Sequence, residues 1–189
     1  MINFFSFLIF LLPWEEINKY YLNNVNALYA EFDEILVSDG ERTEYKGKLW
    51  ADRKGYLKFL ITEPDSQLLF VRKDKVFLYD FDDKKETEIF SSPYLPDFFL
   101  FNFENLYSLK EEKNRKDTVI YVFERKDTNY VYDLIKLFLP INDKKPYKLN
   151  IISSSLSVEY VIVFKKFIIN PILSEEIFQK VQSLKKEKK

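Results

Sequence analysis

The chain has 189 residues, enough for one domain with a sizeable core and too few for two comfortable ones. Acidic and basic residues nearly cancel, 30 against 29, so the net charge offers no field that would steer nucleic acid or an anionic membrane surface. The sequence contains neither histidine nor cysteine, which excludes thiol nucleophiles, imidazole bases, disulfides and metal sites built on these two residues.

The first apolar stretch covers residues 2–13 (INFFSFLIFLLP). It is shorter than the roughly 20 residues that a membrane-spanning helix needs, and it fits the apolar region of a secretory signal. We therefore expect residues 1–13 to be a signal peptide and residues 14–189 to be the exported domain. No Lys or Arg precedes the stretch and no small-x-small cleavage site follows it, so a mis-assigned start or a buried first element is the alternative.

An amphipathic helix is predicted to follow. Trp14, Ile17, Tyr21 and Val25 recur at helical spacing, and two glutamates directly after Trp14 favour the positive N-terminal end of a helix. The pattern ends near residues 23–24. An isolated helix of this length is marginal in water, so it must lie on an apolar partner.

Most of the remaining chain alternates as β-strands do. Strands are predicted over 28–37, 45–53, 56–62, 67–72, 75–81, 86–90, 118–125, 130–140, 148–153 and 157–167. Ser38-Asp39-Gly40 is a turn signal, and the two-residue link at 73–74 implies antiparallel neighbours. Turn signals about every ten residues, without a helical crossover, predict a meandering antiparallel sheet that curls into a barrel or half-barrel.

Residues 91–109 (SSPYLPDFFLFNFENLYSL) interrupt this rhythm. Two prolines forbid a central strand, and the density of phenylalanine is unlike that of a polar surface loop. Pro96 at the first turn of a short helix would offer Phe98, Phe99 and Phe101 to an apolar partner. The alternative is an aromatic plug that only closes the core.

The stretch from Tyr45 to Asp80 has an apolar face with a charge at its end. Gly47, Leu49, Ala51 and Arg53 share one face of their strand. Aromatic residues make up 18% of the chain, which predicts either a very large core or a cavity to line. The candidate lining residues are equally compatible with a closed core: Leu49, Leu57, Phe59, Ile61, Leu69, Val71, Phe77 and Tyr79.

Several short motifs, together with the order of the elements, resemble the LolA family of periplasmic lipoprotein carriers over nearly the whole chain. Phe32 with Glu34 stands where the family has F-x-Q, and residues 47–53 (GKLWADR) resemble G-x-L-W-x-x-R-P. Weaker likenesses are Leu57 with Phe59 at an aromatic pair, residues 63–65 (EPD) at an x-P-D turn, residues 73–79 at D-G-x-x-x-W-x-Y, and residues 177–178 at F-x-F. The chain departs from the pattern at Glu34, where the family has glutamine, and at residues 54–55, where its proline is missing.

The resemblance implies a mainly β fold with few helices, in which a curled antiparallel sheet forms a half-open barrel under a helical lid. The lid residues would be Trp14, Ile17, Tyr21, Pro96, Phe98, Phe99, Leu100 and Phe101. Lipoprotein acyl chains would bind in the cavity beneath the lid, and Arg53 would hold the lid closed through hydrogen bonds to backbone carbonyls of the lid.

The same resemblance implies a monomeric periplasmic carrier without cofactor, metal or nucleic acid. It would receive lipoproteins from an inner-membrane ABC transporter and pass them to an outer-membrane acceptor like LolB. That acceptor is itself lipid-anchored through cysteine, so a chain without cysteine matches the carrier better.

The residues alone leave three alternatives open. The first is that Arg53 is an ordinary surface charge at a strand end. A carboxylate hydrolase would need an acid and a base, but the acidic pairs at 82–83, 111–112 and 175–176 are adjacent residues, which point to opposite faces of a strand or into solvent. A lipid-sensing envelope regulator or a glycolipid carrier of the same half-barrel architecture is the third alternative.

Overall fold

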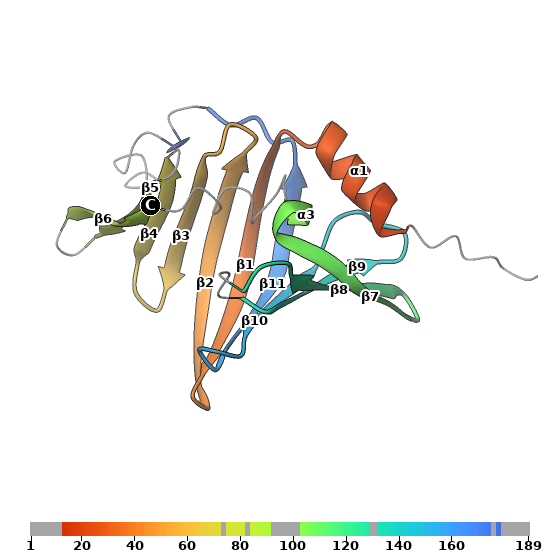
Figure 1. The fold of residues 1–189 in the computed structure, drawn as a ribbon. Helices are drawn as coiled ribbons and strands as arrows, with labels where there is room; N and C mark the ends of the chain where they lie inside the picture. The colour runs from red at the N-terminus through yellow and green to blue at the C-terminus, as the bar shows by residue number, and fades with distance from the viewer. Residues whose placement is uncertain are drawn as a thin grey trace, which may run out of the picture.

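The structure is a computed structural model, which describes residues 13–72, 75–81, 84–91, 103–128, 132–174 and 177–178. Its helices and strands are drawn in Figure 1. In chain order they are α1 (Trp14–Asn24), β1 (Ala27–Ser38), β2 (Glu41–Asp52), β3 (Leu57–Glu63), β4 (Gln67–Arg72), β5 (Lys75–Asp80), β6 (Lys85–Ser91), α3 (Phe103–Leu106), β7 (Tyr107–Arg115), β8 (Thr118–Arg125), β9 (Leu134–Pro140), β10 (Lys148–Ser153) and β11 (Val158–Ile169).

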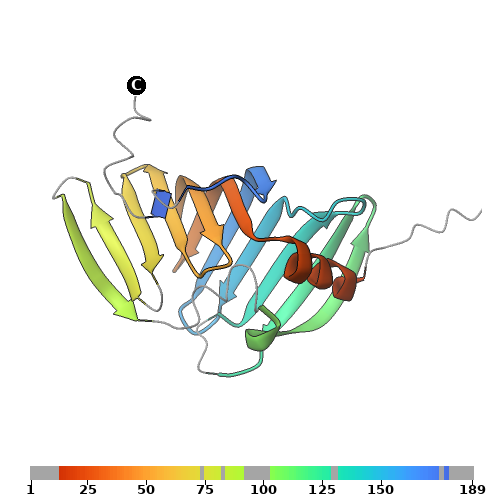
Figure 2. The ribbon, with the colours of Figure 1, turned by 90° about the horizontal axis from the view of Figure 1, so that it is seen from above.

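The strands form an 11-stranded antiparallel sheet in the order β6-β5-β4-β3-β2-β1-β11-β10-β9-β8-β7. The sheet is curled and does not close, so β6 and β7 lie at opposite edges (Figure 2). The prediction of a mainly β fold with few helices and an incomplete barrel is therefore confirmed. The first and last strands, β1 and β11, pair at the centre of the sheet.

The central hairpin follows from its turn residues. Ser38 pairs with Glu41, which leaves a two-residue loop between β1 and β2. Both loop residues have positive φ, 51° at Asp39 and 83° at Gly40. This is the conformation of a type I′ turn, whose twist matches that of the flanking strands and which Asp-Gly favours. The turn predicted at these residues is present.

Apolar side chains cover both faces of the sheet. We call the face that carries α1 and α3 the inner face. Its cluster of buried residues runs from Val76 on β5 to Tyr107 on β7 and includes Trp14 and Ile17 of α1. On the outer face, a smaller cluster around Trp50, Leu68 and Phe70 is covered by the chain at Ile177–Phe178.

Strand β7 was not predicted from the sequence. Its residues after Tyr107 are mostly charged and exposed (YSLKEEKNR), so they show no apolar alternation. The strand lies at an edge of the sheet, where charged side chains are common because they discourage pairing with another chain. A strand without a buried face leaves no periodic signal to detect.

Candidate functional site

The register of β2 to β5 places apolar side chains in rows across the inner face. Leu49 pairs with Phe59, Phe59 with Leu69, and Leu69 with Leu78. The neighbouring row runs Ala51, Leu57, Val71 and Val76. The second row is fully buried, whereas Phe59, Leu69 and Leu78 are only half-buried. The first row is therefore the more accessible part of this apolar surface.

The absence of a side chain at Gly47 on β2 leaves room for the ring of Phe32 on β1 and for the backbone of β3. A Cβ atom at this position would lie 2.6 Å from Cζ of Phe32 and 2.8 Å from the carbonyl oxygen of Leu60. The ring of Phe32 then meets Phe59 edge to face, with centroids 6.1 Å apart. The glycine of the GKLW motif thus has a packing role in the middle of the sheet.

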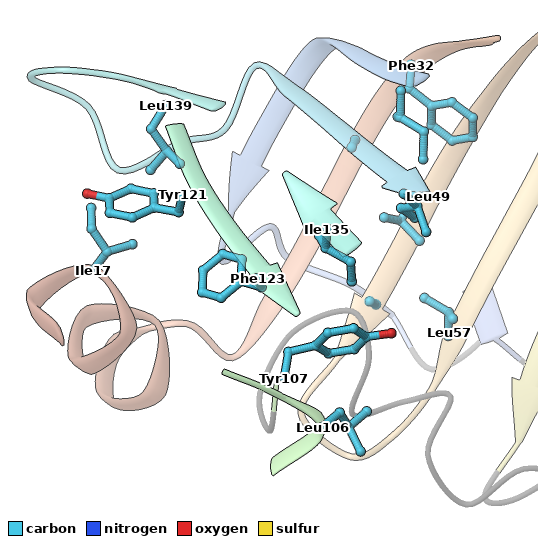
Figure 3. Close-up of a cluster of buried hydrophobic side chains, with 14 of the residues drawn as sticks. Ile17, Phe32, Leu49, Leu57, Leu106, Tyr107, Tyr121, Phe123, Ile135 and Leu139 are labelled. Carbon is cyan, nitrogen blue, oxygen red and sulfur yellow. The ribbon is translucent and has the colours of Figure 1, made fainter. Parts of the chain in front are cut away.

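Helix α1 covers the other half of the inner face, toward β8. The ring of Trp14 lies 4.6 Å from that of Phe123 and 5.4 Å from that of Tyr121, measured between centroids. Ile17 is 2% exposed and belongs to the same cluster. Figure 3 shows Ile17 next to Tyr121 above the helix, with Phe123 close by to the right. The apolar side of the amphipathic helix is thus the side that packs on the inner face.

Two side chains of α1 also make hydrogen bonds to distant parts of the chain. Trp14 donates its Nε1–H to Oε1 of Glu104 at 2.9 Å, which ties the start of the helix to α3. The hydroxyl of Tyr21 donates to the carbonyl oxygen of Lys144 at 2.7 Å. Burial, reinforced by Tyr20 and Asp143, raises the pKa of Tyr21 well above its ordinary value, so this hydroxyl keeps its proton.

Arg53 binds the C-terminal end of the same helix. Its Nε and Nη2 donate to the carbonyl oxygen of Val25 at 3.1 and 2.6 Å, and Nη2 also donates to the carbonyl oxygen of Tyr21 at 2.9 Å. Its own backbone N–H donates to Asn26 at 2.9 Å, because β2 ends opposite the start of β1. A guanidinium is well placed there, since the last carbonyls of a helix lack partners and carry partial negative charge.

The predicted lining residues divide between the two faces. Leu49, Leu57, Phe59, Ile61, Leu69 and Val71 belong to the inner cluster. Phe77 and Tyr79 belong to the outer cluster, so assigning them to the same cavity as the other six is wrong. Strand β5 is apolar at four consecutive positions, so alternation alone could not decide whether the odd-numbered or the even-numbered residues face inward. The pairing with β4 shows that Val76 and Leu78 face inward.

Only some of the predicted lid residues lie within the described ranges. Trp14, Ile17 and Tyr21 lie on the side of α1 that packs on the inner face. The other predicted lid residues, Pro96, Phe98, Phe99, Leu100 and Phe101, lie outside the described residues, as do the proposed signal peptide through Leu12 and the acidic pairs at 82–83 and 175–176.

Sequence reasoning missed the contribution of the last strands to the inner face. Tyr121, Phe123 and Ile135 are among its most deeply buried residues. Their strands were predicted, but the partner of α1 was not, because period-two alternation identifies a face without saying what covers it. Phe32 and Glu34 were noted only as a motif; both point to the inner face, where Phe32 is part of the cluster.

Two chemical properties complete the description of the site. Within the described ranges, no group of three or more acidic residues is arranged to hold a metal ion. None of the helices described here is long and apolar enough to cross a bilayer. What the inner face offers is an apolar surface, a helix on half of it and a few polar side chains.

Comparison with known proteins identifies the fold. No protein-family model and no curated sequence matches this chain. A LolA superfamily protein from Nitrosomonas europaea has a similar structure, with a TM-score of 0.50 and 14% identity, covering 87% of this chain and 95% of that chain. A Vibrio parahaemolyticus domain described as an outer membrane lipoprotein-sorting protein gives a TM-score of 0.53 at 12% identity, covering 90% and 95%.

A DUF1329 family protein from Desulfovibrio piger gives a TM-score of 0.52 at 12% identity, covering 89% of this chain and 96% of that chain. The three likenesses extend over nearly the whole of each chain. The protein therefore has the curled-sheet fold of the LolA superfamily, as the motifs of the sequence had indicated.

Proposed function

We propose that this protein is an exported carrier that binds the acyl chains of lipoproteins on the inner face of its sheet, under a lid that includes α1. In this proposal residues 1–13 direct export, residues 14–189 form one carrier domain in the periplasm, and no reaction is catalysed. The observation that carries the proposal is an amphipathic helix on an apolar curled sheet, bound at its C-terminal end by the side chain of Arg53.

The energetics of such a carrier require a lid that opens at a cost. Each methylene removed from water contributes about 0.8 kcal/mol, so a partly buried acyl chain would bind by on the order of 5 to 10 kcal/mol. Breaking hydrogen bonds to a charged group costs roughly 1.5 to 3 kcal/mol. Because Arg53 is an exposed residue, we expect its contribution at the low end of that range. The lid must open to admit cargo, so the cost of breaking these hydrogen bonds is subtracted from the binding free energy. The cargo is therefore bound less tightly and is released more easily.

The carrier then needs no nucleotide of its own to make the transfer proceed in one direction. Cargo would arrive from an inner-membrane ABC transporter and leave for an outer-membrane acceptor of LolB type that binds it more tightly. The row Leu49, Phe59, Leu69 and Leu78, in which the last three side chains are half-buried, is the part of the inner face that we expect to contact the acyl chains. The predicted lid residues 96–101 would complete the cover.

The test is to replace Arg53 with leucine and follow a lipoprotein through loading and release. Wild-type protein is expected to take up lipoprotein released from inner-membrane vesicles and to pass it to outer-membrane vesicles. R53L is expected to load and to release several-fold more slowly, because a lid without its hydrogen bonds no longer favours the empty, closed state.

Arg42 provides the matched control, since it lies on β2, the strand that ends directly before Arg53, and its ion pair with Glu44 is exposed. R42L should load and release like the wild type. Normal release by R53L would refute the role of Arg53 while leaving the carrier function standing. Purified protein that carries phospholipid or glycolipid but never lipoprotein would favour a lipid-binding function of the same fold.

A further inference from the structure

One carboxylate of the central strand lies on the apolar inner face. Side chains alternate along β1, so Ala30, Phe32, Glu34 and Leu36 point to one side. Ala30 and Phe32 belong to the inner cluster, which fixes that side as the inner face. Glu34 therefore stands between Phe32 and Leu36 on a surface that is otherwise built from apolar and aromatic residues.

The other acidic residues of β1 have a different environment. Glu31 and Asp33 point to the outer face, where Asp33 pairs with Lys165 at 2.9 Å and Glu31 lies 3.8 Å from Lys166. Within the described part of the chain, Glu34 has no cation and no hydrogen-bond donor as a partner. Burial raises the pKa of its carboxyl above the ordinary value. An unpaired carboxylate on an apolar face costs stability and calls for a partner from outside the chain.

Three tyrosines surround this carboxylate. Tyr45 is directly opposite Glu34 across the β1–β2 pair, and Ile162 is opposite across the β1–β11 pair. Tyr160 lies two residues before Ile162 and so shares the same face. Its ring meets that of Tyr132 edge to face, with centroids 6.1 Å apart, and their hydroxyls share a hydrogen bond. The negative charge of Glu34 also contributes to raising the pKa of both Tyr132 and Tyr160.

A carboxylate with aromatic rings and phenolic oxygens around it is suited to a positively charged nitrogen. The carboxylate supplies the counter-charge, the faces of the rings attract cations, and the hydroxyls accept hydrogen bonds from an ammonium group. An anionic head group would meet the charge of Glu34 without a cation to offset it. The patch lies toward the β1–β2 turn, whereas Arg53 lies at the opposite end of these strands.

We propose that Glu34, with Tyr45, Tyr132 and Tyr160, is a subsite for the ammonium group of an acylated ligand, so that the protein prefers amphiphiles with a cationic amine over those with an anionic head group. This inference rests on the proposed function, because it assumes that acyl chains bind the inner face. Two sources supply such a group: the head group of an aminophospholipid and the free amino terminus of a lipidated polypeptide.

The experiment compares three detergents of equal chain length on the full-length protein, each below its micellar concentration. They are dodecylammonium, dodecyl maltoside and dodecyl sulfate, with binding measured by calorimetry. Wild-type protein is expected to bind the ammonium compound about tenfold more tightly than the sulfate, with the maltoside between them. E34Q is expected to bring the ammonium and sulfate affinities within about twofold of each other while leaving the maltoside affinity unchanged.

Asp33 supplies the matched control, because D33N removes one negative charge from the same strand on the outer face. D33N should keep the preference of the wild type. Two results would refute the subsite and leave the carrier function intact. One is that wild type and E34Q prefer the ammonium detergent over the sulfate equally. The other is that the wild type binds the maltoside but shows no such preference. Failure of all three detergents to bind would overturn both.

The two sources are separated with a diacylated peptide whose amino terminus is free, the same peptide acetylated, and vesicles of phosphatidylethanolamine. A loss of affinity on acetylation that E34Q abolishes would assign the subsite to a lipidated polypeptide. Extraction of phosphatidylethanolamine that E34Q reduces several-fold would assign it to an aminophospholipid. If E34Q alters neither, the subsite is refuted for natural ligands.

Discussion

A single missing side chain at position 47 determines how closely the centre of the sheet can pack. We expect Gly47→Ala to destabilise the protein by about 1 to 3 kcal/mol, the usual cost of an overpacked core. The reason is that the new Cβ would lie 2.6 Å from Cζ of Phe32 and 2.8 Å from the backbone oxygen of Leu60, which cannot rotate away. Urea denaturation measures this change in the free energy of unfolding.

The contact with Phe32 predicts a coupling between the two positions. In a Phe32→Leu background the aromatic ring is absent, so the cost of Gly47→Ala should fall by at least about 0.5 kcal/mol. Equal costs in both backgrounds would assign the strain to Leu60 alone. A Gly47→Ala protein as stable as the wild type would contradict the tight packing.

Glu34 predicts a pH dependence whose sign follows from its raised pKa. The folded state holds this proton more tightly than the unfolded state, so the wild type loses stability as the pH rises from the ordinary carboxyl pKa through the raised value. Glu34→Gln lacks this loss. The variant should therefore melt higher than the wild type at pH 7, with the difference shrinking toward pH 4.

Asp33→Asn is the comparison for this measurement, because Asp33 is ion-paired on the outer face. It should not gain melting temperature at pH 7. If Glu34→Gln melts lower than the wild type at neutral pH, the carboxylate has a stabilising partner and the ammonium subsite loses its basis.

At the scale of elements, α1 is held by contacts at both ends. Trp14→Phe keeps a ring against Tyr121 and Phe123 but removes the hydrogen bond to Glu104, so we expect a loss of about 1 kcal/mol. Trp14→Ala removes the ring as well, for which a buried tryptophan costs about 3 to 5 kcal/mol. Because a terminal helix can detach by itself, part of the loss should appear as faster amide exchange confined to α1.

Hydrogen exchange of both variants, read peptide by peptide, checks this prediction. Glu104→Gln retains an oxygen acceptor and should leave α1 closer to the wild type than Trp14→Phe does. Uniform acceleration across the sheet, with no excess in α1, would show that the helix cannot open separately and would argue against its use as a lid.

The chain at residues 177–178 is the corresponding element on the outer face. Lys58, only 3% exposed, donates from Nζ to the carbonyl oxygen of Ile177 at 2.7 Å, and Phe178 stacks on Tyr56 with centroids 5.6 Å apart. We expect Phe178→Ala to uncover Lys58 and to make the chain beyond Asn170 sensitive to proteases, with a cost in global stability below the roughly 3 kcal/mol of a core Phe→Ala.

Limited proteolysis and urea denaturation of Phe178→Ala measure the two effects. Ile172→Ala serves as the control, since Ile172 is fully exposed. A full core-sized loss of stability without new cleavage would mean that this segment belongs to the cooperative core of the protein.

For the whole molecule, the alternation of strands and their turn residues sufficed to predict the curled antiparallel sheet. Asp39-Gly40 determines the central hairpin by its backbone, and Trp14 with Ile17 identifies the buried side of α1. The sequence could not determine which face of β5 is inward, because Val76, Phe77, Leu78 and Tyr79 are all apolar and the register of the neighbouring strands decides the orientation.

The candidate site was predictable only where a charge interrupts an apolar pattern. Arg53 stands out at the end of its strand, and its hydrogen bonds to Tyr21 and Val25 lie where the resemblance implied contacts with lid carbonyls. Glu34 interrupts β1 in the same way, but strand β1 carries two other carboxylates nearby, and only pairing with β2 and β11 distinguishes the inward one.

The pairing of β1 with β11 also governs how the molecule can be assembled. A chain that emerges through a membrane from its N-terminus would present one side of β1 without a partner until residues 158–169 arrive. Contacts between such distant segments make folding slow, since the intervening loop must be closed first. Until then the half-finished sheet would expose the unpaired backbone edge of β1 beside apolar side chains, so a protein of this topology is prone to aggregate until its last strand arrives.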